Sequence, residues 1–294
     1  MDDPGTDMTG LRPRTVSARF AVGLASLIGL IGFLWPFLLP VVAVGDAATV
    51  RTAPFLLAGV TGLCLLAILG ELGTGTVRPA RIVALLGVLV AINATLRLLP
   101  TFLGASPVFL LIILVGAVFG GAIGFQLGAL TLLISSFLIG GVGPWLPYQM
   151  LGAGWVGLTA GLLPRLDGHP RRRLVLLATF GGGWGLLYGA LLNLSFWPFT
   201  APGAEYATSL SWVPGLSFGD TVATYVRFYL VTSLPHDATR AIANVVLVLA
   251  LGGPIVRLLE RYRSRFTWQP VEFGPSAVGE PAVMDHERTV ARLA

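Results

Sequence analysis

The chain alternates long apolar runs with short polar segments that are rich in arginine. The longest of these runs, residues 98–164, contains no charged side chain. A helix needs about 20 predominantly apolar residues to cross a bilayer, and about 17 suffice in short cases. We therefore predict three short membrane-spanning helices within residues 107–164. Glycines at 120–124 should separate the first from the second, and residues 143–148 (GPWLPY) the second from the third.

The same pattern predicts five further spans, at residues 20–42, 54–72, 82–99, 174–195 and 235–259. Residues 220–234 form a shorter amphipathic stretch with an internal arginine, and we expect a helix that lies on the outer face. The polar ends, residues 1–19 and 266–294, are expected to be disordered cytoplasmic tails. The predicted fold class is an all-α integral membrane protein with about eight transmembrane helices.

Composition agrees with this interpretation and excludes a soluble protein. Hydrophobic residues make up 55% of the chain and charged residues 11%, and the mean hydropathy is +0.82. A soluble domain has roughly 25% charged residues. The net charge is +5, and all 19 basic residues are arginine. Because they lie between apolar runs, they indicate membrane topology rather than nucleic-acid binding. Most fall on the cytoplasmic side if both termini are cytoplasmic.

Nothing in the sequence indicates catalysis, a metal or a cofactor. The nucleotide-binding, metalloprotease and nucleophile-elbow motifs are absent. Cys64 is the single cysteine, so it forms neither an intrachain disulfide nor a multi-cysteine metal site. The N-terminus lacks a small-residue cleavage site behind a short apolar core, so we expect no cleaved signal peptide. We expect a protein that is not an enzyme, and any ATP-driven step would require a partner.

Polar residues within apolar spans are costly and are therefore candidates for function. Asp237, Arg240 and Asn244 are spaced i, i+3 and i+7, which places them on one face of a helix, and His236 precedes them. One interpretation is a capped helix start with an Asp237–Arg240 pair. The other is the polar wall of a ligand pocket, and both can hold together.

Six further residues are candidates by position. Asn93 and Arg97 are four residues apart, and Arg97 alternatively extends to the lipid headgroups. The aromatic residues are alternatively interface anchors or packing residues. A lone amide inside a span needs a partner, and we expect Asn193 to be the companion of Asn244. The candidates from these other spans are Asn93, Arg97, Tyr148, Gln149, Trp155 and Asn193.

Several motifs together resemble a known family. Small residues with four-residue spacing occur at Ala80 and Ala84 and at Gly87 and Ala91, and GPWLPYQMLGAGWVGLTAGLL occupies residues 143–163. With the Thr-Ser-Leu segment that precedes His236, they make residues 81–265 similar to the substrate-binding subunits (S components) of energy-coupling factor (ECF) vitamin transporters. Residues 20–72 add two helices to that six-helix core.

The resemblance implies a function and partners. Such a subunit captures a vitamin from outside, and here the likeness is greatest to subunits for cobalamin-type corrinoids. The small residues Ala80, Ala84, Gly87 and Ala91 would dock on a transmembrane coupling subunit, which works with ATP-binding-cassette ATPases. The pocket would open outward between the third, sixth, seventh and eighth spans, under residues 100–106. The resemblance implies no nucleic-acid partner and a location in the cell membrane.

Two other classes stay open at this point. A self-contained secondary transporter would need a coupling-ion site, usually a buried carboxylate, and no Asp or Glu lies at the centre of a predicted span. A membrane-embedded enzyme or assembly factor would need converging acid, base or metal-ligand groups. Only His236 and Asp237 are available for that, and as neighbours they point to different sides of a helix.

Overall fold

The computed structural model describes residues 18–38, 59–60, 62–63, 77–99, 103–166, 168–199, 209–213 and 215–266. Regular structure in this part of the chain is helical. The elements are α1 (Ala18–Leu38), α3 (Val77–Leu96), α4 (Val108–Phe119), α5 (Gly121–Ile139), α6 (Leu146–Ala160), α7 (Pro170–Leu194), the 3-10 helix η1 (Trp197–Phe199), α8 (Phe218–Thr232) and α9 (Leu234–Phe266).

Helices α5, α7 and α9 are long and apolar enough to cross a membrane. Helices α1, α3 and α4 have shorter apolar stretches, and the 12 residues of α4 extend only about 18 Å. The all-helical prediction is confirmed for the described residues, whereas the count of eight spans stays a prediction. The expected span at 54–72 lies outside the described residues, apart from four helical positions between 59 and 63.

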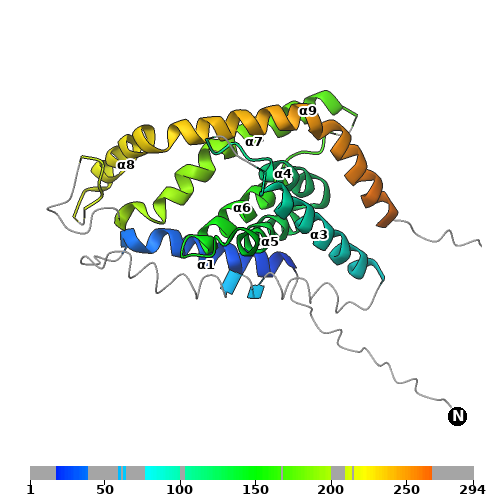
Figure 1. The fold of residues 1–294 in the computed structure, drawn as a ribbon, viewed down its shortest axis with the longest axis horizontal. Helices are drawn as coiled ribbons and strands as arrows, with labels where there is room; N and C mark the ends of the chain where they lie inside the picture. The colour runs from blue at the N-terminus through cyan, green and yellow to red at the C-terminus, as the bar shows by residue number, and fades with distance from the viewer. Residues whose placement is uncertain are drawn as a thin grey trace, which may run out of the picture.

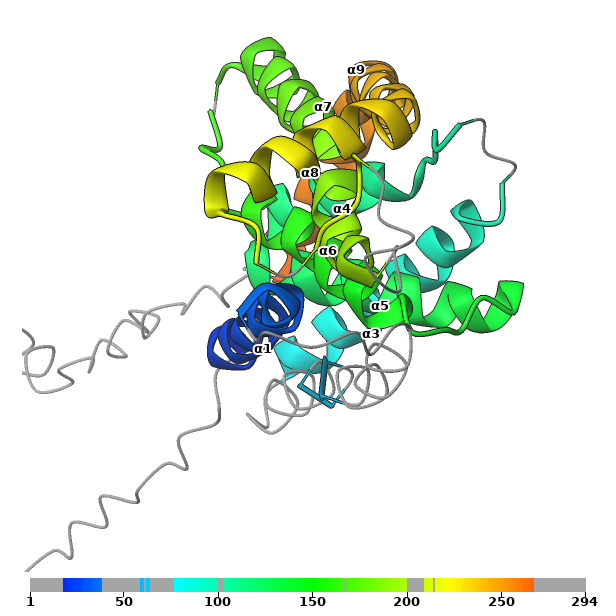
Figure 2. The same ribbon diagram turned by 90° about the vertical axis from the view of Figure 1, so that its left-hand side faces the viewer.

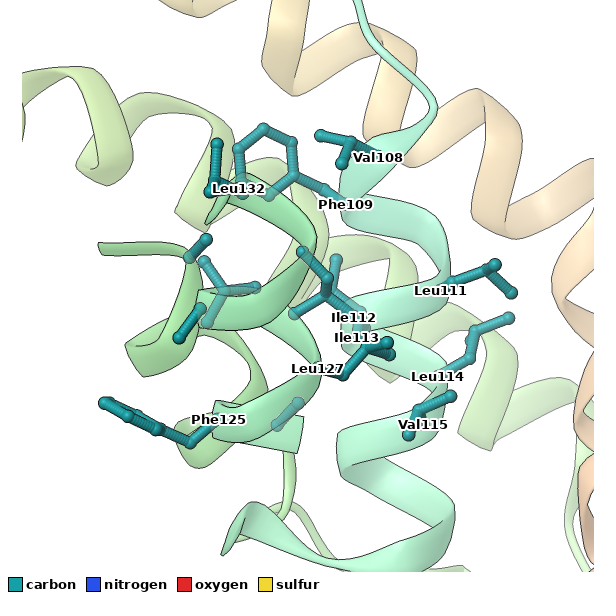
Figure 3. Close-up of a cluster of buried hydrophobic side chains, with 14 of the residues drawn as sticks. Val108, Phe109, Leu111, Ile112, Ile113, Leu114, Val115, Phe125, Leu127 and Leu132 are labelled. Carbon is teal, nitrogen blue, oxygen red and sulfur yellow. The ribbon is translucent and has the colours of Figure 1, made fainter. Parts of the chain in front are cut away.

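Helix α4 is the centre of the bundle because it is apolar on every side. Every residue from Val108 to Gly116 is buried. Side chains of α4 and α5 fill the space between the two helices, among them Phe109, Ile112 and Leu127 (Figure 3). A helix that is hydrophobic all round is either surrounded by lipid or buried among other helices, and the burial of α4 shows the second case. The charge-free run therefore supplies the core of the molecule as well as its membrane-facing surface.

The glycine breaks are partly as predicted. Gly120, with φ of +104°, separates α4 from α5, but Gly121 and Gly124 lie inside α5. There they allow close contact with α6, since a Cβ atom on Gly124 would lie 2.5 Å from the carbonyl oxygen of Gly157. The second break is a turn after Gly140, and Pro147 and Tyr148 already belong to the first turn of α6.

The other helices form two groups around this centre. Helices α7 and α9 run side by side, and α8 leads into α9 at one end (Figure 1). Helix α1 packs on α5 and α6, on the opposite side of the molecule from α9 in both views (Figures 1 and 2). Helix α1 begins at the end of the molecule where α9 finishes (Figure 1). This arrangement places both described chain ends on one side, in keeping with the predicted topology.

Candidate functional site

The polar face of α9 lies against a row of glycines on α7. Gly181, Gly185 and Gly189 follow each other at four-residue spacing, so they lie on one side of the helix. A Cβ atom on Gly185 would lie 2.4 Å from the Cα atom of Ala241. The two backbones therefore approach closely enough for side chains of α9 to contact the backbone of α7 directly.

All three predicted polar residues of α9 lie where the two backbones come close together. The side-chain amide of Asn244 donates to the carbonyl oxygen of Gly181 at 2.9 Å. The Arg240 guanidinium donates to the carbonyl oxygen of Gly185 at 3.2 Å and to Asp237 at 2.5 Å. Their spacing predicted a shared helix face, and the structure shows all three on the face that meets α7. The Asp237–Arg240 pair of the first interpretation is present, and the wall of a ligand pocket stays a prediction.

Asp237 is the more tightly enclosed member of the ion pair. Its side chain is only 3% exposed, and it lies where a Cβ atom of Gly189 would be. Above it, Gly104 has φ of +82°, and its own Cβ position lies 3.1 Å from the carbonyl oxygen of His236 and 3.4 Å from Arg240. Gly104, in the loop after α3, therefore lies close to the start of α9; the predicted pocket beneath residues 100–106, of which 103–106 are described, stays a prediction.

A second polar group joins α3, α5 and α6. Asn93 is fully buried and donates to the hydroxyl of Thr131 at 3.2 Å. One turn further along, Arg97 donates to Ser135 at 2.8 Å, to Ser136 at 3.2 Å and to the side-chain oxygen of Gln149 at 3.1 Å. Arg97 therefore turns toward α5 and α6, and the alternative of an extension to the headgroups does not describe its position.

Tyr188 of α7 connects the two polar groups. Its hydroxyl donates to the main-chain oxygen of Gln149 at 3.5 Å, and the side chain of that residue accepts from Arg97. Its ring lies 5.3 Å below the guanidinium carbon of Arg240 and meets Phe109 edge to face at 4.8 Å. Polar residues from α3, α5, α6, α7 and α9 thus form one connected set, which we call the polar network.

Three buried side-chain atoms of this network have no hydrogen-bond partner among the described residues. They are the amide oxygens of Asn93 and Asn244 and one carboxylate oxygen of Asp237. Buried polar atoms are nearly always paired, so each of these atoms indicates a missing donor. All three are acceptors, and a bound molecule with N–H or O–H groups, or water, would satisfy them.

Other candidates lie apart from the polar network. Trp155 donates to Ser26 of α1 at 3.0 Å, and Tyr148 meets Phe33 of α1 edge to face at 5.0 Å. His236 is exposed. The expected pairing of Asn193 with Asn244 is wrong, because Asn193 donates to Ser233 at 2.7 Å, three helical turns from the Gly181 carbonyl that Asn244 contacts.

Several residues of the network escaped the sequence analysis. Tyr188, Thr131, Ser135 and Ser136 were not candidates, although the threonine and Ser135 are four residues apart in an otherwise apolar helix. Asn93 and Arg97 have the same spacing. Asn93 therefore contacts Thr131, and Arg97 contacts Ser135 one turn further along. The glycine row on α7 was also visible in the sequence, and small residues at four-residue spacing indicate a close helix contact.

The predicted docking residues lie on the opposite side of α3 from Asn93. Ala84, Gly87 and Ala91 are exposed, and nothing lies within 4 Å of the Cβ position of Gly87. Ala80 belongs to α3, and its side chain lies outside the described part. In the described residues this leaves a smooth strip of small side chains along one helix. Such a strip permits a second helix to approach closely.

The surface groove and the search for metal ligands add no residue to this site. A surface groove of about 470 Å³, lined by Arg171, Arg172, Val175, Leu176 and Thr179, lies near the start of α7 and contains no candidate residue. Within the described ranges there is no group of three or more His, Cys, Asp or Glu residues that could hold a metal ion.

These features together define a class. Apolar helices of membrane-spanning length around a buried polar network are typical of an integral membrane protein.

A family comparison then identifies the chain more closely. Residues 81–252 match the model of the ECF transporter, substrate-specific component, which covers more than half of the chain. The protein therefore belongs to the family of ECF transporter substrate-specific components, a transporter family and not a family of enzymes. Neither a search of curated proteins nor a search of solved structures found a match.

Proposed function

We propose that the protein captures a vitamin or related micronutrient from outside the cell and delivers it to an ATP-driven ECF module. The observation that supports this most directly is the polar network. It gathers polar groups from five helices, and three of its buried acceptor atoms have no partner among the described residues. Polar groups in hydrocarbon are costly, and one shared ligand accounts for them more simply than separate roles do.

The proposed pocket lies between α3, α6, α7 and α9. Asn93, Arg97, Gln149, Arg240 and Asn244 are the residues that we expect to reach the substrate, with Asp237 holding Arg240. Asn193 and His236 lie at the rim of this region on sequence grounds. We assign Tyr148 and Trp155 to the contact with α1, because that is where their rings and the indole N–H are engaged.

The coupling partner would dock on α3. Ala84, Gly87 and Ala91 are exposed and small, and Ala80 continues their spacing toward the cytoplasmic end. The proposed partners are a transmembrane coupling subunit and ATP-binding-cassette ATPases, since the sequence has no nucleotide-binding motif of its own. We further propose eight spans with both termini cytoplasmic, arranged as a six-helix core at 81–265 behind two added helices at 20–72.

The substrate is best identified by what remains bound during purification. We expect mass spectrometry of the detergent-solubilised protein to find one enriched small molecule, and a cobalamin-type corrinoid is the first candidate. An Asn244→Leu variant purified in parallel should lose that molecule while it keeps its thermal unfolding midpoint. Equal enrichment in both preparations would show that the molecule is bound elsewhere, and the proposed pocket would be wrong.

A further inference from the structure

Arg97 carries a charge that no acidic group of the described chain neutralises. Among the described residues, ion pairs join Arg173 to Glu260 and Arg240 to Asp237, and no carboxylate in that part of the chain lies within ion-pair distance of Arg97. The two arginines of the polar network therefore differ in kind. Arg240 has its counter-ion on the preceding turn, whereas the three partners of Arg97 are all neutral.

The neutral partners are arranged to hold a cation. The hydroxyl of Ser135 donates to the carbonyl oxygen of Thr131 at 2.6 Å, and that of Ser136 donates to Leu132 at 2.7 Å. Each hydroxyl has one hydrogen, so both oxygens present only lone pairs to Arg97. Gln149 likewise presents its amide oxygen. These groups fix the orientation of the guanidinium, but they leave its full positive charge in place.

The guanidinium of Arg97 also keeps unused donors. A guanidinium has five N–H groups. In the described contacts, Nη1 makes two hydrogen bonds and Nη2 makes one, so two N–H groups are unused. A planar fork with two remaining donors matches a carboxylate or a phosphate. One turn earlier on the same helix, the buried oxygen of Asn93 lacks a donor.

We propose that Arg97 binds an acidic group of the substrate, a carboxylate or a phosphate, and that Asn93 accepts a hydrogen bond from the same molecule. This inference rests on the proposed binding function and assigns its charge specificity to one residue. A half-buried cation held by neutral oxygens is costly in an apolar surrounding, and an incoming anion removes that cost. Arg240 cannot replace Arg97 in this role, because the charge of Arg240 is already paired with Asp237.

The test compares acids with neutral analogues of the same shape. The full chain in lipid nanodiscs is titrated with nicotinate and nicotinamide, biotin and biotinamide, and pantothenate and pantothenol. Tryptophan fluorescence reports the thermal unfolding midpoint. We expect at least one of the acids to raise the midpoint while its neutral partner does not. Molecules that co-purify with the protein should carry a carboxylate or a phosphate group.

Variants then assign the effect to one side chain. Arg97→Gln should weaken binding of the anionic compound roughly 10- to 150-fold, the range for a hydrogen bond to a charged group. It should also abolish the preference for the acid. Arg97→Lys keeps the charge without the planar fork, so we expect an intermediate affinity, and it serves if Arg97→Gln does not fold. Arg81→Gln, the same change at an exposed position of α3, should bind like the parent chain.

Each other result has a definite meaning. A neutral analogue that binds as tightly as its acid, or an Arg97→Gln variant that keeps the affinity for the acid, would overturn the inference and leave the binding function standing. A co-purified molecule without a carboxylate or a phosphate group would do the same. If no compound of the panel stabilises the protein and nothing co-purifies with it, the proposed binding function fails together with the inference.

Discussion

Gly189 shows how a single missing side chain positions the most enclosed charge of the molecule. A Cβ atom at this position would lie 2.0 Å from the carboxylate of Asp237, so the carboxylate could not keep its present place. The glycine therefore determines where Asp237 lies, and Asp237 in turn holds Arg240. This dependence links a backbone feature of α7 to the charge arrangement on α9.

We expect Gly189→Ala to damage the polar network. Overpacking of this kind typically costs about 1–3 kcal/mol. The thermal unfolding midpoint of the purified protein should fall, and ligand binding should weaken because Arg240 loses its fixed position. Gly183→Ala is the matched control on the same helix, since nothing lies within 4 Å of its Cβ position. That control should keep or raise the midpoint, and equal midpoints for the two variants would contradict the role of Gly189.

Asn244 offers a second test at the scale of one residue. Its amide donates to Gly181, and its buried oxygen lacks a donor. Replacement of a buried hydrogen-bonding group costs about 1–3 kcal/mol, so Asn244→Leu should weaken ligand binding roughly 5- to 150-fold. Isothermal titration measures this effect, and Val246→Leu at an exposed position of α9 is the control. Unchanged affinity in a folded Asn244→Leu variant would place the pocket elsewhere.

The candidate residues illustrate what a sequence can and cannot predict at this scale. The i, i+3, i+7 spacing on α9 predicted a shared face because a helix fixes the angle between its own residues. No such rule fixes which neighbour that face meets. Asn193 therefore has Ser233 as its partner and not Asn244, and Trp155 has Ser26, which is 129 positions away.

Helix α1 is an integral part of the described bundle. Phe33 is 1% exposed and contacts the rings of both Tyr148 and Trp155. A Cβ atom on Gly29 would lie 2.6 Å from Leu151, so the helix fits closely against α6. This helix precedes the region that matches the family model. It covers a part of α6 that a six-helix core alone would leave open to lipid or to a partner.

We expect Phe33→Ala to destabilise the protein substantially. Loss of a buried phenylalanine typically costs about 3–5 kcal/mol in a packed core. The thermal midpoint should fall well below that of Leu30→Ala, a control on the same helix whose side chain is 49% exposed. Because Phe33 contacts α6 away from the polar network, the folded fraction should still bind ligand. Similar midpoints for both variants would mean that α1 associates only loosely.

The strip of small residues on α3 gives a prediction about assembly. Ala84→Trp places a large ring on the surface where we propose that the coupling subunit docks, so co-purification with that subunit should be lost. Ligand binding should stay nearly intact, because Asn93 and Arg97 lie on the other side of the helix. Leu249→Trp, at an exposed position of α9, is the control. Loss of ligand binding with the complex preserved would contradict this assignment.

Helix boundaries were predictable where a glycine in a turn interrupts an apolar run. Gly120 ends α4, and the turn after Gly140 precedes α6, because these glycines adopt positive φ values that other residues avoid. Gly121 and Gly124 gave the same signal in the sequence but serve a different purpose. Their small size allows α5 to contact α6, and only the neighbouring helix distinguishes a glycine for packing from a glycine for a turn.

At the scale of the whole molecule, charged side chains hold one end of the helix bundle and the polar network holds the other. Arg173 pairs with Glu260, and Arg263 donates to the carbonyl oxygen of Val118 at 3.0 Å, so α7, α9 and α4 are joined where the arginines gather. The sequence predicted this gathering from the positive-inside rule, which acts through the membrane potential and lipid charge. It did not predict the pairings, which depend on how the helices pack.

The arrangement of arginines leads to a prediction about topology. Arg51, Arg97, Arg227 and Arg240 lie outside or within the membrane in the proposed orientation, and the other 15 of the 19 arginines lie in cytoplasmic segments. Helix α1 starts at the end of the molecule where α9 finishes (Figure 1), as required if both termini share one side.

A green fluorescent protein fused after Arg265 should therefore fluoresce, because it folds on the cytoplasmic side. Alkaline phosphatase fused at the same position should be inactive, and fused after Val213 in the outer segment it should be active. An active phosphatase after Arg265 would reverse the orientation, and it would also place the polar network in the inner half of the membrane, where it could not receive a substrate from outside.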